Sequence, residues 1–341
     1  MKALVISDIG KAEFTSVEPA RPGPGDVVLK VRTVGLCGSD LNTFRGLNPL
    51  AKLPRIPGHE IGGTIVETGA DVPADFAPGR SAIVVPYTSC GKCASCRKRR
   101  TNACQFNATL GVQRDGGMSE RLVVPHEKLI LNDRLPARHL SLVEPLSVGF
   151  HAVARGSVAA GDTVVVLGGG MIGVGAMLGA IQRGARVIAV EVSEAKRQLL
   201  LDFGVAAVVN PLRVDQLEAV RELTGGDGAD VAIEAVGLPE TFVAAVDMAG
   251  FAGRVVFVGY AKKDVSFNTS LFNLKELDMF GSRNATRADF GAVIGFVEAN
   301  PAISDKLISR VFPWDEAEGS FEFWEANRNE TLKVMVEFPD E

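Results

Sequence analysis

Residues 163–182 contain no charged side chain, and 20 such residues are long enough to span a membrane. Six glycines interrupt this run, at positions 168, 169, 170, 173, 175 and 179, and the β-branched segment 163–167 precedes them. A buried strand, a tight turn and a buried helix fit this pattern better than a helix within lipid. The run therefore predicts an interior strand-and-helix unit of a globular protein.

Within the run, Gly168, Gly170 and Gly173 form the pattern GxGxxG, with Met171 and Ile172 before the last glycine. Glycines at this spacing make a tight turn and let backbone amides approach a pyrophosphate, although glycines as simple turn formers are the alternative. Context favours a dinucleotide. Glu191 ends the next expected strand, 23 residues after Gly168, where a carboxylate binds both ribose hydroxyls of NAD and repels the 2′-phosphate of NADP.

Apolar runs alternate with helix-like segments from about residue 160 onward. The expected strands are residues 163–167, 186–190, 207–210, 231–234, 254–258 and 278–282, and the expected helices between them include 194–203, 214–224 and 240–248. This alternation is typical of a doubly wound α/β fold with a six-stranded parallel sheet. Arg197, on the first of these helices, is placed either to reach the adenosine ribose or to lie exposed on the helix surface.

The remaining sequence predicts a second domain, because 341 residues are more than twice the usual length of one domain, about 150 residues. Short β-branched runs between Pro and Gly fill the first 150 residues or so and indicate a strand-rich domain. A last expected strand, residues 333–337, has no place in the six-stranded sheet. We therefore expect the chain to return to the first domain after the nucleotide domain.

The charge balance excludes some classes of partner. The 36 basic and 41 acidic residues give a net charge of −5, which disfavours broad attraction to nucleic acid or an anionic membrane. The apolar stretch after Met1 is too short for a secretion signal. A reducing cytoplasm is the expected location, and there clustered cysteines bind metal more often than they form disulfides.

Four of the five cysteines, Cys90, Cys93, Cys96 and Cys104, follow the pattern CxxCxxCx7C. Four thiolates at this spacing can bind zinc tetrahedrally, with no open coordination position, so the expected role of the metal is structural. Residues 97–100, Arg-Lys-Arg-Arg, lie inside the loop and leave open a zinc ribbon that grips phosphate backbones. The acidic composition and the nucleotide domain disfavour that alternative.

The fifth cysteine, Cys37, indicates a different kind of site. It stands in Cys-Gly-Ser-Asp, while His59 and Glu60 stand in Gly-His-Glu, both within the strand-rich first domain. Cys, His and a carboxylate are the donor types of a catalytic zinc that keeps one position open. Taken singly, each residue is equally compatible with a structural role, and the combination with a nucleotide domain favours catalysis.

Together these motifs resemble those of the zinc-containing medium-chain dehydrogenases and reductases over essentially the whole chain. The resemblance implies a GroES-like catalytic domain at residues 1–148, with a zinc lobe at about 88–106, and its return at 287–341. It also implies a Rossmann NAD-binding domain at residues 149–286 and a homo-oligomer, either a dimer or a tetramer. Two zinc ions per chain are expected, together with NAD.

Residues 144–149, Glu-Pro-Leu-Ser-Val-Gly, are similar to a segment of the sorbitol and polyol dehydrogenase branch. By this resemblance, Cys37, His59 and one of Glu60 or Glu144 bind the catalytic zinc, and the sequence leaves the choice between the two glutamates open. Residues 281–286 are similar to a stretch in bacterial dehydrogenases that oxidise galactonate or gulonate at C5. This similarity makes Arg283 and Asn284 candidate substrate residues, with Arg283 suited to a carboxylate.

The expected reaction is reversible oxidation of a secondary alcohol of a polyol or sugar acid, with hydride transfer to NAD. Many relatives have a histidine for proton transfer where this chain has Asn42, so Ser39 is expected to accept the alcohol proton first. The nicotinamide side is expected to be lined by Ala235, Val236, Gly237, Val258 and Gly259. A threonine-type amino-alcohol dehydrogenase and a catalytically silent NAD-binding relative remain the alternatives.

Overall fold

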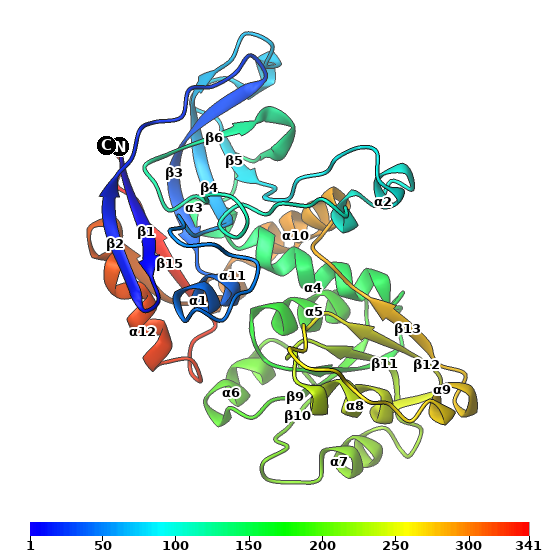
Figure 1. Ribbon diagram of the computed structural model, residues 1–341. Helices are drawn as coiled ribbons and strands as arrows, with labels where there is room; N and C mark the ends of the chain where they lie inside the picture. The colour runs from blue at the N-terminus through cyan, green and yellow to red at the C-terminus, as the bar shows by residue number, and fades with distance from the viewer. Residues whose placement is uncertain (341) are drawn as a thin grey trace. The chain divides into compact units, whose positions relative to one another are not determined.

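The structure is a computed structural model that describes residues 1–340. It divides into two compact units: Met1–Pro145 together with Ile294–Glu341, and Leu146–Val293. In Figure 1 the first unit carries the blue, cyan and red parts of the chain, and the second carries the green to orange part. The two ends of the chain thus share one unit.

A seven-stranded sheet organises the first unit, in the order β14-β15-β3-β4-β5-β7, with β6 also paired to β3 and with β1-β2 as a separate hairpin. Its strands are β1 (Lys2–Asp8), β2 (Lys11–Ser16), β3 (Asp26–Gly35), β4 (Glu60–Thr68), β5 (Ser81–Val84), β6 (Arg121–Pro125), β7 (Leu129–Leu131), β14 (Ile308–Pro313) and β15 (Lys333–Glu337). The predicted last strand is confirmed, and β15 pairs with β3 in antiparallel fashion.

Short helices and turns surround this sheet. They are α1 (Gly38–Phe44), η1 (Ala74–Phe76), α2 (Ala94–Arg97), η2 (Thr101–Ala103), η3 (His126–Lys128), α3 (Ala137–Leu140), α11 (Pro301–Leu307), η4 (Trp314–Gly319) and α12 (Ser320–Ala326). Two longer helices, α4 (Val143–Arg155) and α10 (Arg287–Ala299), contain the points at which the chain passes between the units.

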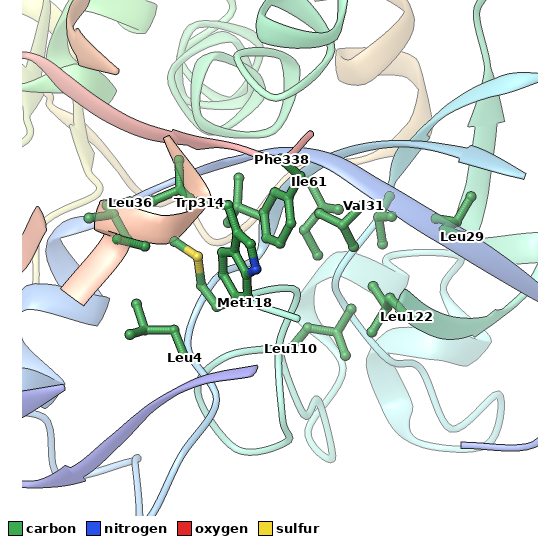
Figure 2. Packing of buried hydrophobic residues seen from close by; sticks show 14 of the residues in the cluster. Leu4, Leu29, Val31, Leu36, Ile61, Leu110, Met118, Leu122, Trp314 and Phe338 are labelled. Carbon is green, nitrogen blue, oxygen red and sulfur yellow. The ribbon is translucent and has the colours of Figure 1, made fainter. Parts of the chain in front are cut away.

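The core of the first unit draws on both chain ends. Leu4, Ile61 and Met118 are fully or almost fully buried in the same cluster as Trp314 and Phe338 (Figure 2). The rings of Trp314 and Phe338 stack with their centroids 4.2 Å apart. Because burial of apolar surface is the main stabilising term in folding, the returning C-terminal segment is part of this domain's core.

The second unit contains a six-stranded parallel sheet in the order β10-β9-β8-β11-β12-β13, which is the Rossmann order 3-2-1-4-5-6. Its strands are β8 (Thr163–Leu167), β9 (Arg186–Val190), β10 (Ala207–Val209), β11 (Ala229–Glu234), β12 (Ala249–Phe257) and β13 (Asp278–Gly281). Its helices are α5 (Met171–Gln182), α6 (Glu194–Asp202), α7 (Gln216–Leu223), α8 (Pro239–Met248) and α9 (Ser270–Leu274). The predicted α/β fold is confirmed, and β12 begins earlier than expected.

The uncharged run forms β8, the glycine turn and α5. Residues 164–167 of β8 are fully buried, and residues 173–180 of α5 are buried on every face. The absence of charge therefore reflects burial between a sheet and other helices. Within residues 1–340, no helix is long and apolar enough to cross a membrane.

Candidate metal centres and cofactor site

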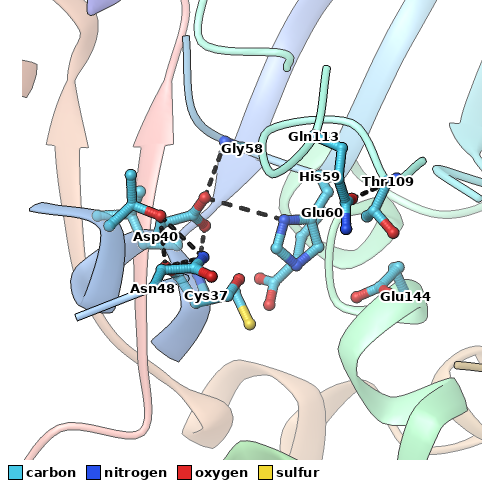
Figure 3. Close-up of polar contacts among 12 residues, drawn as sticks. Cys37, Asp40, Asn48, Gly58, His59, Glu60, Thr109, Gln113 and Glu144 are labelled. Atoms are coloured by element: carbon cyan, nitrogen blue, oxygen red, sulfur yellow. Dashed lines mark hydrogen bonds and ion pairs between the residues drawn. The ribbon is translucent and has the colours of Figure 1, made fainter. Parts of the chain in front are cut away.

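The sheet of the first unit brings Cys37, His59 and Glu60 together. In the antiparallel pair β3–β4, Gly35 lies opposite Glu60, so Cys37 and His59 emerge at the same end of the two strands. One ligand atom from each of the three residues lies within 4.8 Å of the others (Figure 3). Gly35 has a steric reason to be glycine, because a Cβ there would overlap with Oε2 of Glu60.

Asp40 joins the two segments that carry these donors. It is fully buried, its Oδ2 accepts the backbone N–H of Cys37 at 2.9 Å, and its Oδ1 accepts the N–H of Gly58 at 3.1 Å. The same Oδ1 lies 3.9 Å from Nδ1 of His59 (Figure 3). Nδ1 of His59 has no hydrogen-bond partner among residues 1–340, so Asp40 supports the donor set through the backbone of Cys37 and Gly58 and through its nearby charge.

Glu60 has a second partner, a lysine from the other end of the chain. Nζ of Lys333 donates to Oε1 of Glu60 at 2.6 Å and to Oε2 at 2.5 Å, and also to the carbonyl oxygen of Leu36 at 2.9 Å. Lys333 and Glu60 are each 1% exposed. A buried charge is stable only when it is paired and hydrogen-bonded, and this lysine meets that need for Glu60.

The other glutamate of the predicted set, Glu144, lies in the first turn of α4, and its side chain extends toward the same site (Figure 3). It does not belong to the group of donors within 4.8 Å of one another. The hydroxyl of Tyr87 donates to Oε1 of Glu144, and both side chains are buried. A neutral phenol therefore holds this carboxylate, whereas a charged ammonium holds Glu60.

The pKa values of His59, Glu144 and Tyr87 are all raised at this site, through burial, neighbouring charges or both. Burial lowers the pKa of His59, but the charges of Asp40 and Cys37 outweigh burial and raise that pKa well above its ordinary value. Burial raises the pKa of Glu144, and burial together with the charge of Glu144 raises the pKa of Tyr87 well above its usual range. The site concentrates anionic donors in a buried space, which fits a divalent cation.

Two further predicted residues lie on α1. The hydroxyl of Ser39 is buried and has no hydrogen-bond partner among residues 1–340. Asn42 is half-buried, and its backbone carbonyl accepts the N–H of Leu47. Asn42 has no titratable group. The hydroxyl of Ser39, in contrast, has its hydrogen-bonding capacity free.

The four lobe cysteines also converge, with their Sγ atoms within 4.8 Å of one another. Sγ of Cys93 lies 3.9 Å from Sγ of Cys104, close to the roughly 3.8 Å expected for two thiolates of a tetrahedral zinc site with Zn–S bonds of about 2.3 Å. The hydroxyl of Ser95 and backbone N–H groups lower the pKa of Cys93 to about 5, which favours the thiolate that binds metal. The geometry of the lobe thus fits zinc.

In the second unit the glycine turn follows β8 directly. Gly168 has a φ of +102°, a conformation that side chains rarely adopt, and a Cβ on Gly173 would overlap with the carbonyl oxygen of Gly168. Gly170 is the N-cap of α5, whose first two residues are Met171 and Ile172. The turn therefore presents a helix N-terminus at the carboxyl end of the sheet, where a pyrophosphate binds.

Glu191 lies beside this turn, after β9. Its Oε2 accepts the N–H of Gly169 at 2.5 Å and its Oε1 accepts the N–H of Ser193 at 2.7 Å. Arg197 is exposed, whereas its neighbour Lys196 is 8% exposed and interacts electrostatically with Glu191. Burial lowers the pKa of Lys196, and the charge of Glu191 partly opposes this shift.

The remaining predicted residues of this unit follow its strands. Residues 235–237 come after β11, and residues 258–259 come after β12. Arg283 and Asn284 come after β13 and are half-buried, and Asn284 has a φ of +53°. These residues therefore lie at the carboxyl edge of the parallel sheet.

Asp40, Lys333, Tyr87 and Lys196 are absent from the sequence prediction. Lys333 is 273 positions from Glu60, and Tyr87 is 57 from Glu144, so no local spacing relates either pair. Asp40 belongs to the same motif as Cys37 and is the N3 residue of a helix that Cys37 caps. Its contact with the backbone of Cys37 could therefore have been predicted from the sequence.

Both the N-terminal part and the central part of the chain match known protein families. Residues 23–134 match the alcohol dehydrogenase GroES-like domain, and residues 172–299 match the zinc-binding dehydrogenase family. The chain is 33% identical to L-galactonate-5-dehydrogenase of Escherichia coli over 93% of each chain. It is also 33% identical to the sorbitol dehydrogenase of Halalkalibacterium halodurans, over 98% of this chain and 99% of that one.

A crystal structure shows the same fold. The putative zinc-binding dehydrogenase of Sinorhizobium meliloti, bound to NADP, superimposes with a TM-score of 0.88 at 32% identity over 98% of each chain. The predicted GroES-like and Rossmann architecture is confirmed. Because relatives of this identity cover almost the whole chain, the protein belongs to the zinc-binding dehydrogenases, enzymes that oxidise alcohols with zinc and a nicotinamide cofactor.

Proposed function

We propose that this enzyme oxidises a secondary alcohol of a polyol or sugar acid and transfers the hydride to NAD. The observation that carries the proposal is the convergence of Cys37, His59 and Glu60, whose ligand atoms lie within 4.8 Å of one another in a buried site. Zinc bound there would act as a Lewis acid that lowers the pKa of the alcohol hydroxyl. The donor set of thiolate, imidazole and carboxylate suits this role.

Glu60 is the proposed third ligand, because it belongs to the converging group and Glu144 does not. Lys333 holds both oxygens of Glu60 and fixes the direction of its carboxylate. Glu144 is the proposed outer carboxylate, oriented by Tyr87, and its role is to hold the water or substrate hydroxyl in the open position.

Ser39 is the proposed first acceptor of the alcohol proton. Its hydroxyl has no hydrogen-bond partner among residues 1–340, so it can accept from the alcohol and donate onward to water. Asn42 can orient such a water but cannot take up the proton at neutral pH. We therefore expect Ser39→Ala to lower kcat with little change in the Kd for NADH.

The proposed preference for NAD rests on Glu191. Its carboxylate is fixed by two backbone N–H groups and lies next to the glycine turn, so it would accept hydrogen bonds from ribose hydroxyls and repel a 2′-phosphate. Glu191→Ser should raise the kcat/KM ratio of NADP to NAD by about tenfold or more. An unchanged ratio would contradict the ribose role.

Within this substrate class a sugar acid is favoured, because L-galactonate-5-dehydrogenase is among the relatives and Arg283 supplies a guanidinium suited to a carboxylate. Arg283→Ala should raise KM for an aldonate about tenfold and leave KM for a neutral polyol unchanged. Equal effects on both substrates would remove Arg283 from this role.

The test of the function is a screen of NAD reduction with the zinc-loaded enzyme against aldonates, neutral polyols and amino alcohols. The proposal predicts the highest kcat/KM for an aldonate or polyol, and loss of activity when zinc is chelated. Highest activity on a threonine-like amino alcohol would contradict the substrate class. Binding of NADH without turnover of any alcohol would indicate a catalytically silent relative.

A further inference from the structure

Glu234 is a buried carboxylate that has no part in the proposed chemistry. It ends β11 and is fully buried. Its Oε1 accepts three hydrogen bonds, from the N–H of Val236 at 2.8 Å, the N–H of Gly237 at 2.7 Å and the hydroxyl of Thr241 at 2.7 Å. Its Oε2 is buried without a partner among residues 1–340. Burial of a polar atom without a hydrogen-bond partner costs free energy, so we expect this side chain to have a function that offsets the cost.

The segment that Glu234 holds lies at the point where the strand order of the sheet reverses. Strands β8 and β11 are neighbours there, and ligands of such sheets bind outside the carboxyl ends of these strands. A Cβ on Gly168 would lie 2.8 Å from Cγ2 of Val236 and 3.3 Å from the carbonyl oxygen of Ala235. Residues 235–236 therefore pack against the glycine turn.

Glu234 also contacts a second loop, residues 258–260. Its carbonyl oxygen accepts the N–H of Val258 at 2.9 Å and of Gly259 at 3.2 Å. A Cβ on Gly259 would overlap with Oε2 of Glu234 and would lie 2.5 Å from the backbone nitrogen of Gly237. One residue thus ties together the two loops that follow neighbouring strands.

These anchored loops present apolar side chains to the surface. Val236 is 44% exposed, Leu238 is 48% exposed and Tyr260 is 74% exposed. Exposed apolar side chains on a backbone that a buried, hydrogen-bonded side chain holds in place indicate a surface shaped for a ligand. If the pyrophosphate of a dinucleotide binds at the glycine turn, the group that fits beside these loops is the flat nicotinamide ring.

We propose that Glu234 is a positioning residue that fixes residues 235–237 and 258–259 in the shape that receives the nicotinamide ring. This inference rests on the proposed use of a nicotinamide cofactor. The other half of the cofactor depends on Gly168–Gly173 and Glu191, none of which hydrogen-bonds to the side chain of Glu234 within residues 1–340. The effects on the two halves are therefore separable by experiment.

The experiment compares NADH with ADP-ribose, which lacks the nicotinamide, by isothermal titration of the purified enzyme. Glu234→Met removes the acceptor oxygens at similar volume, and we expect it to weaken NADH binding about tenfold while the Kd for ADP-ribose stays within about twofold. Glu234→Gln keeps one acceptor oxygen and should restore most of the NADH affinity. Glu240→Gln, on the neighbouring helix α8, is the matched control.

Equal weakening of NADH and ADP-ribose, or no weakening of either, would overturn the inference. If Glu234→Met does not fold, Thr241→Val removes one of the three donors and should still weaken NADH selectively, by a smaller factor. Unchanged NADH affinity in that variant would overturn the inference as well. Failure of the wild-type enzyme to bind NADH would instead refute the proposed function.

Discussion

The two candidate metal centres both include cysteine but are assembled differently. The lobe takes its four thiolates from residues 90–104, a single loop that contains the short helices α2 and η2. The proposed catalytic donor set takes Cys37 from the N-cap of α1, His59 from the residue before β4 and Glu60 from the start of β4, and a lysine from β15 supports it. We therefore expect that a metal organises the chain in the lobe, whereas at the proposed catalytic site the sheet organises the ligands.

This contrast predicts different losses when one thiolate is removed from each centre. Cys37→Ser should release one of two zinc ions and lower kcat/KM by about 10⁴-fold or more, with little change in Tm, because the sheet persists. Cys104→Ser should also release one zinc but mainly lower Tm. Zinc analysis, kinetics and thermal unfolding of both variants check this, and similar losses of Tm in both would contradict the contrast.

The buried ion pair behind the catalytic site gives the next largest effect. Lys333→Met leaves the charge of Glu60 buried without its cation and should lower the free energy of unfolding by about 3 kcal/mol in chelator-treated protein. The loss should be smaller in the zinc-loaded enzyme, because a bound cation compensates the same carboxylate. Lys333→Arg is the matched control. Equal losses with and without zinc would show that Glu60 does not bind the metal.

The catalytic site should also respond to a single hydroxyl outside its ligand set. Tyr87→Phe removes the hydrogen bond to Glu144 and should lower kcat/KM by about 10–100-fold while zinc content stays unchanged. In a Glu144→Gln background the same change should have little further effect, because the two residues act together. Additive losses of kcat/KM in the double variant would show that Tyr87 and Glu144 act independently.

The smallest effect is expected in the lobe. Ser95→Ala removes the hydroxyl that is the main cause of the lowered pKa of Cys93, so that pKa rises from about 5. Protons then compete with zinc for the thiolate at higher pH, and zinc release on acidification should begin at a higher pH than in the wild type. The zinc-release profile checks this, and catalytic activity at neutral pH should be unaffected.

Local patterns were sufficient to predict the lobe, the glycine turn and the strands of the parallel sheet. The spacing of Cys90, Cys93, Cys96 and Cys104 lies within one loop, and residues 163–167 form β8 as expected. These features depend on neighbours in the sequence. The periodicity of the hydrophobic residues and the spacing of the ligands are therefore sufficient to predict these features.

The support of the catalytic site could not be predicted in the same way. Lys333 is the first residue of β15, before the apolar residues Val-Met-Val, and only the pairing of β15 with β3 brings it to Glu60. Tyr87 follows β5 without a motif of its own. The choice between Glu60 and Glu144 likewise depended on distances, because both glutamates stand in recognisable motifs.

The central claim is that Cys37, His59 and Glu60 hold a second, catalytic zinc. Anomalous diffraction at the zinc absorption edge from crystals of the zinc-loaded enzyme tests it most directly. We expect two peaks, one among the four lobe thiolates and one bound by Cys37, His59 and Glu60, with Glu144 beyond direct bonding distance. A single peak in the lobe, or a second peak bound by Glu144 in place of Glu60, would contradict it.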